Sequence, residues 1–166
     1  HTMRLILRDG AHPARALATN GEVQIADHGD SRSLADMAAR ILAAAPQRFA
    51  IAGHSMGGRV ALEVIAQSPG RVSHLALLDT GCGALPPGEA GERERATRRG
   101  FLETARNQGM GTMARDWARG MVHPARLQDT ALMASIHAMI ERCPVAVLEA
   151  QIEALLARPD RRALLA

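Results

Sequence analysis

Residues 49–58 read Phe49-Ala50-Ile51-Ala52-Gly53-His54-Ser55-Met56-Gly57-Gly58, and this stretch decides the fold. It sets one serine among glycines at the point where a short apolar segment ends. Glycines flanking a serine allow the backbone to take a strained turn that lifts the hydroxyl clear of neighbouring strands. The stretch therefore predicts a sharp turn that presents Ser55.

The segments on either side of this turn support that interpretation. Residues 48–52 are short and apolar, as expected for a buried strand, and Val60, Leu62, Val64 and Ile65 continue as a helix that ends near Pro69. A strand, a turn and a helix in this order predict a nucleophile elbow. The alternative is a tight strand-to-helix turn with an inert serine.

Composition limits the classes of protein to be considered. The chain has 166 residues, enough for one globular domain, and 47% of them are hydrophobic. The net charge is +3, but lysine is absent and the arginines alternate with acidic residues, so we expect solvated faces and no nucleic-acid partner. Cys82 and Cys143 are too few for a disulfide framework or a metal cluster, and no metal or cofactor is expected.

Targeting signals give a weaker prediction. We find no apolar run long enough to span a bilayer and no secretory signal at the start of the sequence, so we expect no membrane association and a cytoplasmic protein.

Further strands and helices are expected around the turn. Residues 4–8, 22–26 and 73–78 have the pattern of short strands, and Ser33 is placed to cap a helix with apolar residues from Leu34 to Leu42. Strands that alternate with helices predict a parallel sheet. From residue 83 onward the sequence predicts only helices, over 89–107, 110–121, 129–142 and 145–158. The predicted division is a sheet core at 1–82 and a helical cap or lid at 83–166.

With a strand, an elbow, a helix, a strand ending in Leu-Leu-Asp-Thr and then a helical insertion, the chain resembles the α/β-hydrolase family. It is most similar to small bacterial members with a helical cap, such as esterases and enol-lactonases, whose elbow often reads Gly-x-Ser-Met-Gly-Gly. The resemblance implies a partial α/β-hydrolase fold, with a parallel sheet core, helices on its faces and an all-helical cap.

The resemblance also implies roles for individual residues. Ser55 would be the nucleophile, and the Met56 N–H would donate to the oxyanion. The second oxyanion donor would come from Gly10 or Ala11, in the loop after the first strand. Asp79 occupies a position where some family members keep the catalytic acid, although aspartate is also common at the start of loops.

After the cap, the sequence departs from the family's pattern. The family's acid and histidine usually follow two further strands there, and the chain stops at Ala166, so we expect the sequence to be incomplete and inactive by itself. None of the histidines matches the family's base: His54 adjoins the serine, His74 is expected to be buried in a strand, and His123 and His137 fall in the cap. His12 and His28 lie on loops at the expected active face.

Two functions follow from these features. The first is a serine hydrolase acting on a small carboxylic ester, thioester or lactone through an acyl-enzyme at Ser55. The second is a catalytically incomplete relative that binds a ligand or partner. A metal-dependent hydrolase is disfavoured, because no residues have the spacing of a metal motif. An exposed sheet edge could also pair with a second chain, giving a homo-oligomer.

Overall fold

The computed structural model describes residues 3–6 and 22–166, and side chains from residue 22 onward. The chain divides into two compact units. Unit 1 comprises His1–Leu85 and Glu153–Ala166, and unit 2 comprises Pro86–Ile152. The sequence-based division placed all of 83–166 in the second domain, whereas in the structure the last fourteen residues group with unit 1.

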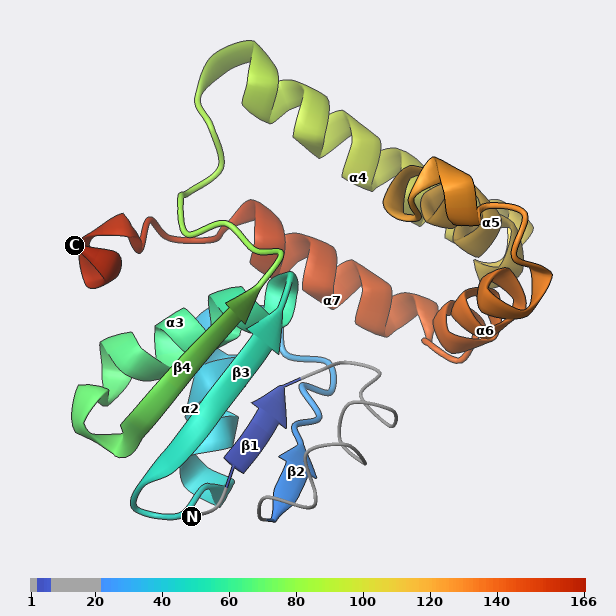
Figure 1. Ribbon diagram of the computed structural model, residues 1–166. Coiled ribbons are helices and arrows are strands. Elements are labelled where there is room, and N and C mark those ends of the chain that lie inside the picture. The colour runs from blue at the N-terminus through green and yellow to red at the C-terminus, as the bar shows by residue number, and fades with distance from the viewer. Residues whose placement is uncertain (1–2, 7–21) are drawn as a thin grey trace. The chain divides into compact units, whose positions relative to one another are not determined.

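Unit 1 contains a parallel four-stranded sheet (Figure 1). Its strands are β1 (Met3–Ile6), β2 (Val23–Ile25), β3 (Phe49–His54) and β4 (Val72–Leu78). They lie in the order β2-β1-β3-β4, and each neighbouring pair is parallel. The carboxyl ends of parallel strands share one edge of a sheet, so the segments after β3 and β4 lie next to each other. The predicted parallel sheet is confirmed.

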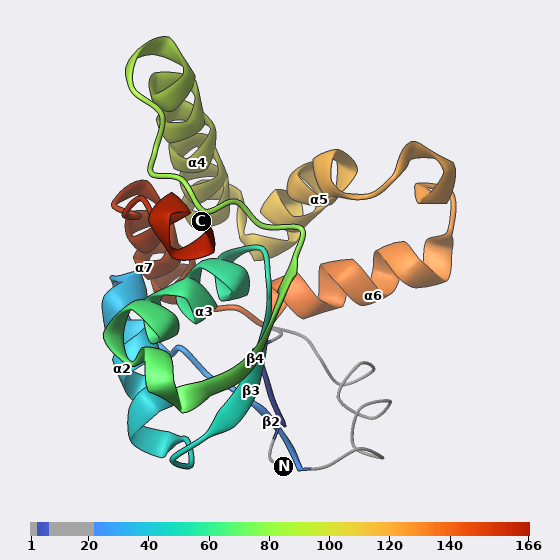
Figure 2. The ribbon, with the colours of Figure 1, turned by 60° about the vertical axis from the view of Figure 1, so that its left-hand side comes forward.

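Two helices cover the same face of this sheet (Figures 1 and 2). Helix α2 (Leu34–Ala44) begins after Ser33, whose side chain accepts a hydrogen bond from Asp36 N at 3.0 Å. This confirms the predicted cap, which satisfies one of the unpaired N–H groups of the first turn. Helix α3 (Met56–Gln67) follows Ser55 directly.

The core of unit 1 lies between the sheet and these helices. Aliphatic and methionine side chains fill it together with a single aromatic ring, as expected from a composition with only two phenylalanines. The buried residues are Leu34, Met37, Ala38, Ile41, Phe49, Ile51, Met56, Val60, Ala61, Val64 and Ala154. Because Met56, Val60 and Val64 are among them, the helix that starts at the serine turn is anchored along its length.

The end of α2 is held by Arg71, the last residue of the short 3-10 helix η2 (Pro69–Arg71). Its Nη2 group donates to the carbonyl oxygens of Leu42, Ala45 and Pro46 at 3.3, 2.8 and 2.7 Å. The guanidinium carbon also lies 5.8 Å from the centre of the Phe49 ring, within the range of a cation–π contact. One arginine thus binds carbonyls that the helix leaves without an intrahelical donor.

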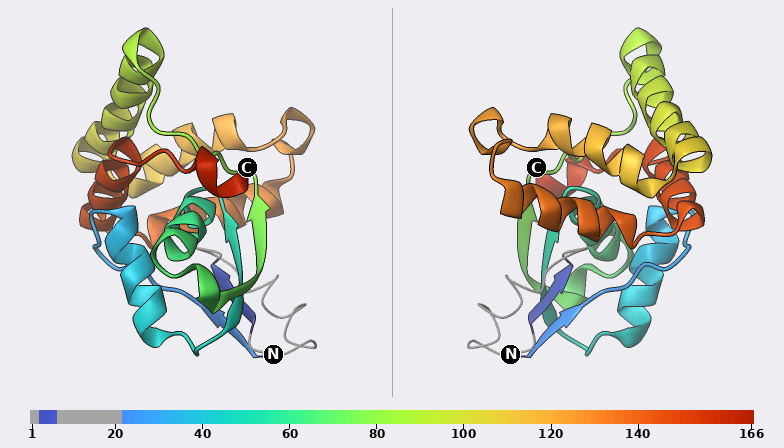
Figure 3. Two further views of the ribbon diagram at one scale, coloured as in Figure 1. Left: turned by 90° about the vertical axis from the view of Figure 1, so that its left-hand side faces the viewer. Right: turned by 90° about the vertical axis from the view of Figure 1, so that its right-hand side faces the viewer.

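Unit 2 is helical, with no strand among its residues. It contains α4 (Gly88–Gln108), α5 (Met110–Met121), η3 (Pro124–Arg126), α6 (Thr130–Glu141) and most of α7 (Val145–Leu156). Helix α5 packs against both α4 and α6 (Figure 3). The bounds agree with the predicted helices, and Asp129 caps α6 by accepting a hydrogen bond from Leu132 N at 3.0 Å.

No single helix in the described part of the chain is long and apolar enough to cross a membrane. Helices α6 and α7 reach the required length and composition only as a pair, and the pair is bent by 91°.

Candidate active site

Ser55 is the single residue between β3 and α3, and its backbone is strained. Its φ is 50° and its ψ is −116°, a region that residues with a Cβ rarely occupy. Within the described residues, Asp79 is the other non-glycine residue with a positive φ, at 45°. Both strained residues directly follow a strand, and the side chains of both are exposed.

Main-chain hydrogen bonds hold the strained peptide in place. The Ser55 N–H donates to Leu78 O at 3.0 Å, which extends the contact between β3 and β4 by one residue. The Ser55 carbonyl oxygen accepts from Gly58 N at 3.1 Å and from the hydroxyl of Thr80 at 2.6 Å. These bonds involve only the main chain of Ser55. No described residue hydrogen-bonds the Ser55 hydroxyl.

Two glycines make this close approach of backbone segments possible. A Cβ at Gly53 would lie 2.3 Å from Gly57 O, and a Cβ at Gly58 would lie 2.5 Å from Thr80 Cγ2. Real side chains do not make contacts this short, so a larger residue at either position would displace the turn. The glycine spacing in the sequence therefore has a steric cause in the structure.

Met56 is the first residue of α3, and its side chain is buried in the core. The first N–H groups of a helix have no intrahelical acceptor, and they lie at the positive end of the helix dipole. A negative charge that develops beside Ser55 would therefore meet donors that are already fixed in position. The other oxyanion donor expected from the sequence, Gly10 or Ala11, lies outside the described residues.

Asp79 and His54 lie at the same edge of the sheet as Ser55. Their side chains approach each other, with His54 Nε2 3.9 Å from Asp79 Oδ2, and both are largely exposed. This distance is too long for a hydrogen bond and leaves only a solvent-screened contact.

The other histidines lie elsewhere in the described part of the chain. His74 was expected to be buried in its strand, but that expectation is wrong: it alternates onto the exposed side of β4, where its Nδ1 lies 3.2 Å from Ser73 Oγ. His123 caps η3 by accepting from Ala125 N, His137 lies on α6, and His28 is buried after β2. No histidine within residues 22–166 hydrogen-bonds Ser55.

Sequence reasoning gave no role to Thr80, which turns out to bind the Ser55 carbonyl. The sequence shows only that Thr80 lies two residues after β4, a strand that neighbours β3. That position does not identify the carbonyl to which its hydroxyl donates. Among the described residues, no three His, Cys, Asp or Glu side chains are grouped so that they could hold a metal ion.

A model of the alpha/beta hydrolase fold family matches residues 12–108, more than half of the chain. The chain belongs to this family. A comparison with curated protein sequences found no match.

Solved structures with similar folds include an esterase from Thermogutta terrifontis, a hydrolase from Pseudomonas aeruginosa and an enol-lactonase from Burkholderia xenovorans. Their TM-scores are 0.77, 0.76 and 0.72, at 21%, 20% and 17% sequence identity. The matches cover 99%, 99% and 95% of this chain and 66%, 67% and 66% of the other chains. The chain thus spans about two thirds of the length of these structures and shares their fold, which confirms the partial α/β-hydrolase fold.

Proposed function

We propose that this protein is a serine hydrolase that cleaves a small carboxylic ester, thioester or lactone through an acyl-enzyme at Ser55. The observation that carries the proposal is the strained, exposed Ser55 between β3 and α3 in a chain of the alpha/beta hydrolase family. The neighbouring esterase and enol-lactonase structures support the choice of substrate class.

In this proposal the Ser55 oxygen attacks the carbonyl carbon of the substrate, and its proton passes to a general base. The carbonyl oxygen becomes an oxyanion, which the Met56 N–H stabilises from the start of α3. A second donor from Gly10 or Ala11 completes the oxyanion hole. When this intermediate collapses, the bond to the alcohol or thiol breaks, and the base gives its proton to that leaving group. Water then loses a proton to the base and attacks the acyl carbon; the bond to Ser55 breaks, and the base returns the proton to the serine oxygen.

Asp79 is the candidate for the acid that orients the base. It follows β4 at the edge of the sheet that also carries Ser55, and this position supports the assignment. The proposal assigns the base to none of the histidines in residues 22–166, because none hydrogen-bonds Ser55. Residues 86–152 would act as a cap that limits the size of the substrate.

The test combines a covalent probe with turnover by the full-length protein. A fluorophosphonate should label the wild type and the Ser68→Ala control, but not Ser55→Ala. The wild type should also hydrolyse members of a panel of p-nitrophenyl esters and lactones that Ser55→Ala leaves intact. Equal turnover by both forms would rule out Ser55 as the nucleophile.

The alternative is a protein that keeps the fold for binding and does not catalyse. One observation favours it: no described residue hydrogen-bonds the Ser55 hydroxyl, and an unassisted serine is a poor nucleophile. A folded, full-length protein that neither reacts with the probe nor turns over any ester would support this second function.

A further inference from the structure

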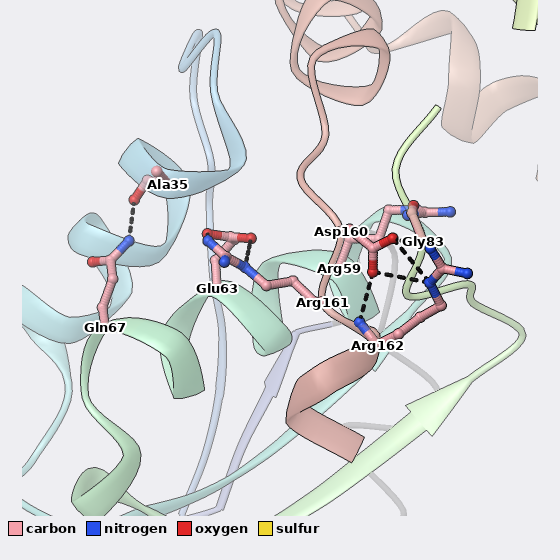
Figure 4. Close-up of polar contacts among 8 residues, drawn as sticks. All are labelled: Ala35, Arg59, Glu63, Gln67, Gly83, Asp160, Arg161 and Arg162. Carbon is pink, nitrogen blue, oxygen red and sulfur yellow. Dashed lines mark hydrogen bonds and ion pairs between the residues drawn. The ribbon is translucent and has the colours of Figure 1, made fainter. Parts of the chain in front are cut away.

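Glu63 is a buried carboxylate on α3, two turns after Ser55. Its side chain is 2% exposed and accepts two hydrogen bonds from Arg161, 2.7 Å from Nε and 2.8 Å from Nη2 (Figure 4). A two-pronged contact of this kind fixes the orientation of both groups, and it compensates a charge that would be costly to bury alone. The same contact raises the pKa of the Arg161 guanidinium.

Arg161 also binds the chain that follows β4. Its main-chain N–H donates to Cys82 O at 2.7 Å, so one residue connects α3 to the segment after the sheet. One turn before Glu63 on α3, Arg59 donates from Nη1 to Gly83 O at 2.8 Å. Figure 4 shows Arg59 and Glu63 on the same helix, reaching these two segments.

These two segments lie inside unit 1, one before the chain leaves this unit and one after the chain has returned to it through α7. The chain leaves unit 1 after Leu85, just beyond Cys82 and Gly83, and returns to it at Glu153, shortly before Arg161. All of the contacts described lie within unit 1. The chain after β4 and the chain after α7 are therefore held together on the helix that begins beside Ser55.

We propose that Arg59, Glu63 and Arg161 form a clamp, which fixes the chain after β4 and the chain after α7 to the helix that follows Ser55. Glu63 and Arg161 are then positioning residues for these two segments of unit 1. The clamp does not depend on the proposed hydrolase function, although its effect on turnover does.

The adjacent Arg162 provides a matched control. It pairs with Asp160, an exposed carboxylate two residues away, and this ion pair does not include the buried Glu63. Both arginines thus form ion pairs in neighbouring positions, but only the ion pair of Arg161 includes a buried carboxylate on α3.

The experiment measures hydrogen exchange by mass spectrometry in the full-length protein. In Arg161→Met and Glu63→Gln, peptides covering 79–87 and 157–165 should exchange at least about tenfold faster, while peptides from α2 and β3 should not change. Arg162→Met leaves the Glu63–Arg161 contact in place, so it should accelerate exchange in both regions less than Arg161→Met does. Arg161→Lys keeps the charge but loses the two-pronged contact, so its exchange should fall between those of the wild type and Arg161→Met.

A double variant keeps the test decisive if a single variant fails to fold. Glu63→Met with Arg161→Met removes the buried charge together with its partner and retains apolar volume, so it should fold. This double variant should still exchange faster in residues 79–87 and 157–165. Unchanged exchange there, or an equal increase throughout α2 and β3, would overturn the clamp.

Turnover adds a second measurement. If Ser55 hydrolyses esters, the double variant should change KM or kcat for them, and Arg162→Met should change neither. If the wild type shows no turnover, the proposed function fails, and the exchange results still decide the clamp.

Discussion

The Thr80 hydroxyl donates a 2.6 Å hydrogen bond to the main-chain carbonyl of Ser55. Thr80 follows β4 and Ser55 follows β3, so this bond joins the ends of two adjacent strands. The carbonyl belongs to the peptide that carries the strained φ and ψ of Ser55. A side chain from the neighbouring strand thus helps to hold the conformation that exposes the serine hydroxyl.

Thr80→Val should weaken the turn without changing the shape of its side chain much. Removing the hydroxyl deletes one hydrogen bond while Gly58 N still serves the carbonyl, so we expect the free energy of unfolding to fall by about 1 kcal/mol. Turnover that depends on Ser55 should fall by about tenfold or more, since small misplacements of a nucleophile are costly. Urea unfolding and ester hydrolysis measure the two effects. Thr80→Ser keeps the hydroxyl, so it should retain more of the stability and more of the turnover than Thr80→Val.

Gly58→Ala should destabilise the protein, although alanine is the better helix former. The new Cβ would lie 2.5 Å from Thr80 Cγ2 and 2.8 Å from Thr80 Cβ, so α3 and the chain after β4 must separate. Crowding of this kind costs about 1–3 kcal/mol of unfolding free energy, which exceeds the gain in helix propensity. Thermal or urea unfolding measures the difference.

Gly100→Ala is the matched control for that prediction. Gly100 also lies in a helix, α4, but a Cβ there would meet nothing within 4 Å. We expect this variant to be more stable than the wild type by about 0.5–1 kcal/mol. If both alanine variants changed stability in the same direction, the steric explanation for Gly58 would be wrong.

Local features of the site were predictable from the sequence. The glycines around Ser55, the apolar residues 49–52 and the Ser33 cap act on neighbouring residues, so their patterns survive in the sequence. The helix bounds from residue 88 onward follow from glycine, proline and apolar periodicity in the same way.

Contacts between distant residues were not predictable. Glu63 and Arg161 are separated by 98 residues, and nothing in the chain specifies which arginine meets a carboxylate on an apolar helix face. A single glutamate among Val60, Ala61, Leu62 and Val64 signals that a partner is required, since a lone buried charge is costly. Arg161 becomes that partner because the chain returns to unit 1 after residue 152. The spacing of apolar residues in the sequence does not predict this return. The exposure of His74 has a similar origin, because it depends on which side of β4 is covered.

Arg71→Met should loosen the end of α2. The substitution keeps much of the aliphatic stem but removes the hydrogen bonds to Leu42 O, Ala45 O and Pro46 O, together with the contact to the Phe49 ring. Bonds from a charged donor contribute about 1.5–3 kcal/mol, so we expect a loss of that size in the free energy of unfolding. Hydrogen exchange should increase most in the last turn of α2. A loss of stability without faster exchange there would place the role of Arg71 elsewhere.

Asp160 should make the folded state sensitive to acid. Its hydrogen bond with Arg162 lowers the pKa of the carboxyl group from 3.8 to about 2, so the folded protein keeps this group ionised at pH values where the unfolded chain takes up a proton. The contribution to stability is therefore complete above about pH 4 and is lost as the pH falls toward about 2. The difference in unfolding free energy between the wild type and Asp160→Asn should accordingly shrink from pH 5 to pH 3. Carboxyl-carbon NMR should show the pKa of Asp160 raised in Arg162→Met, because that variant loses the side-chain donor while the main-chain N–H of residue 162 still donates; an unchanged titration would assign the shift to another group.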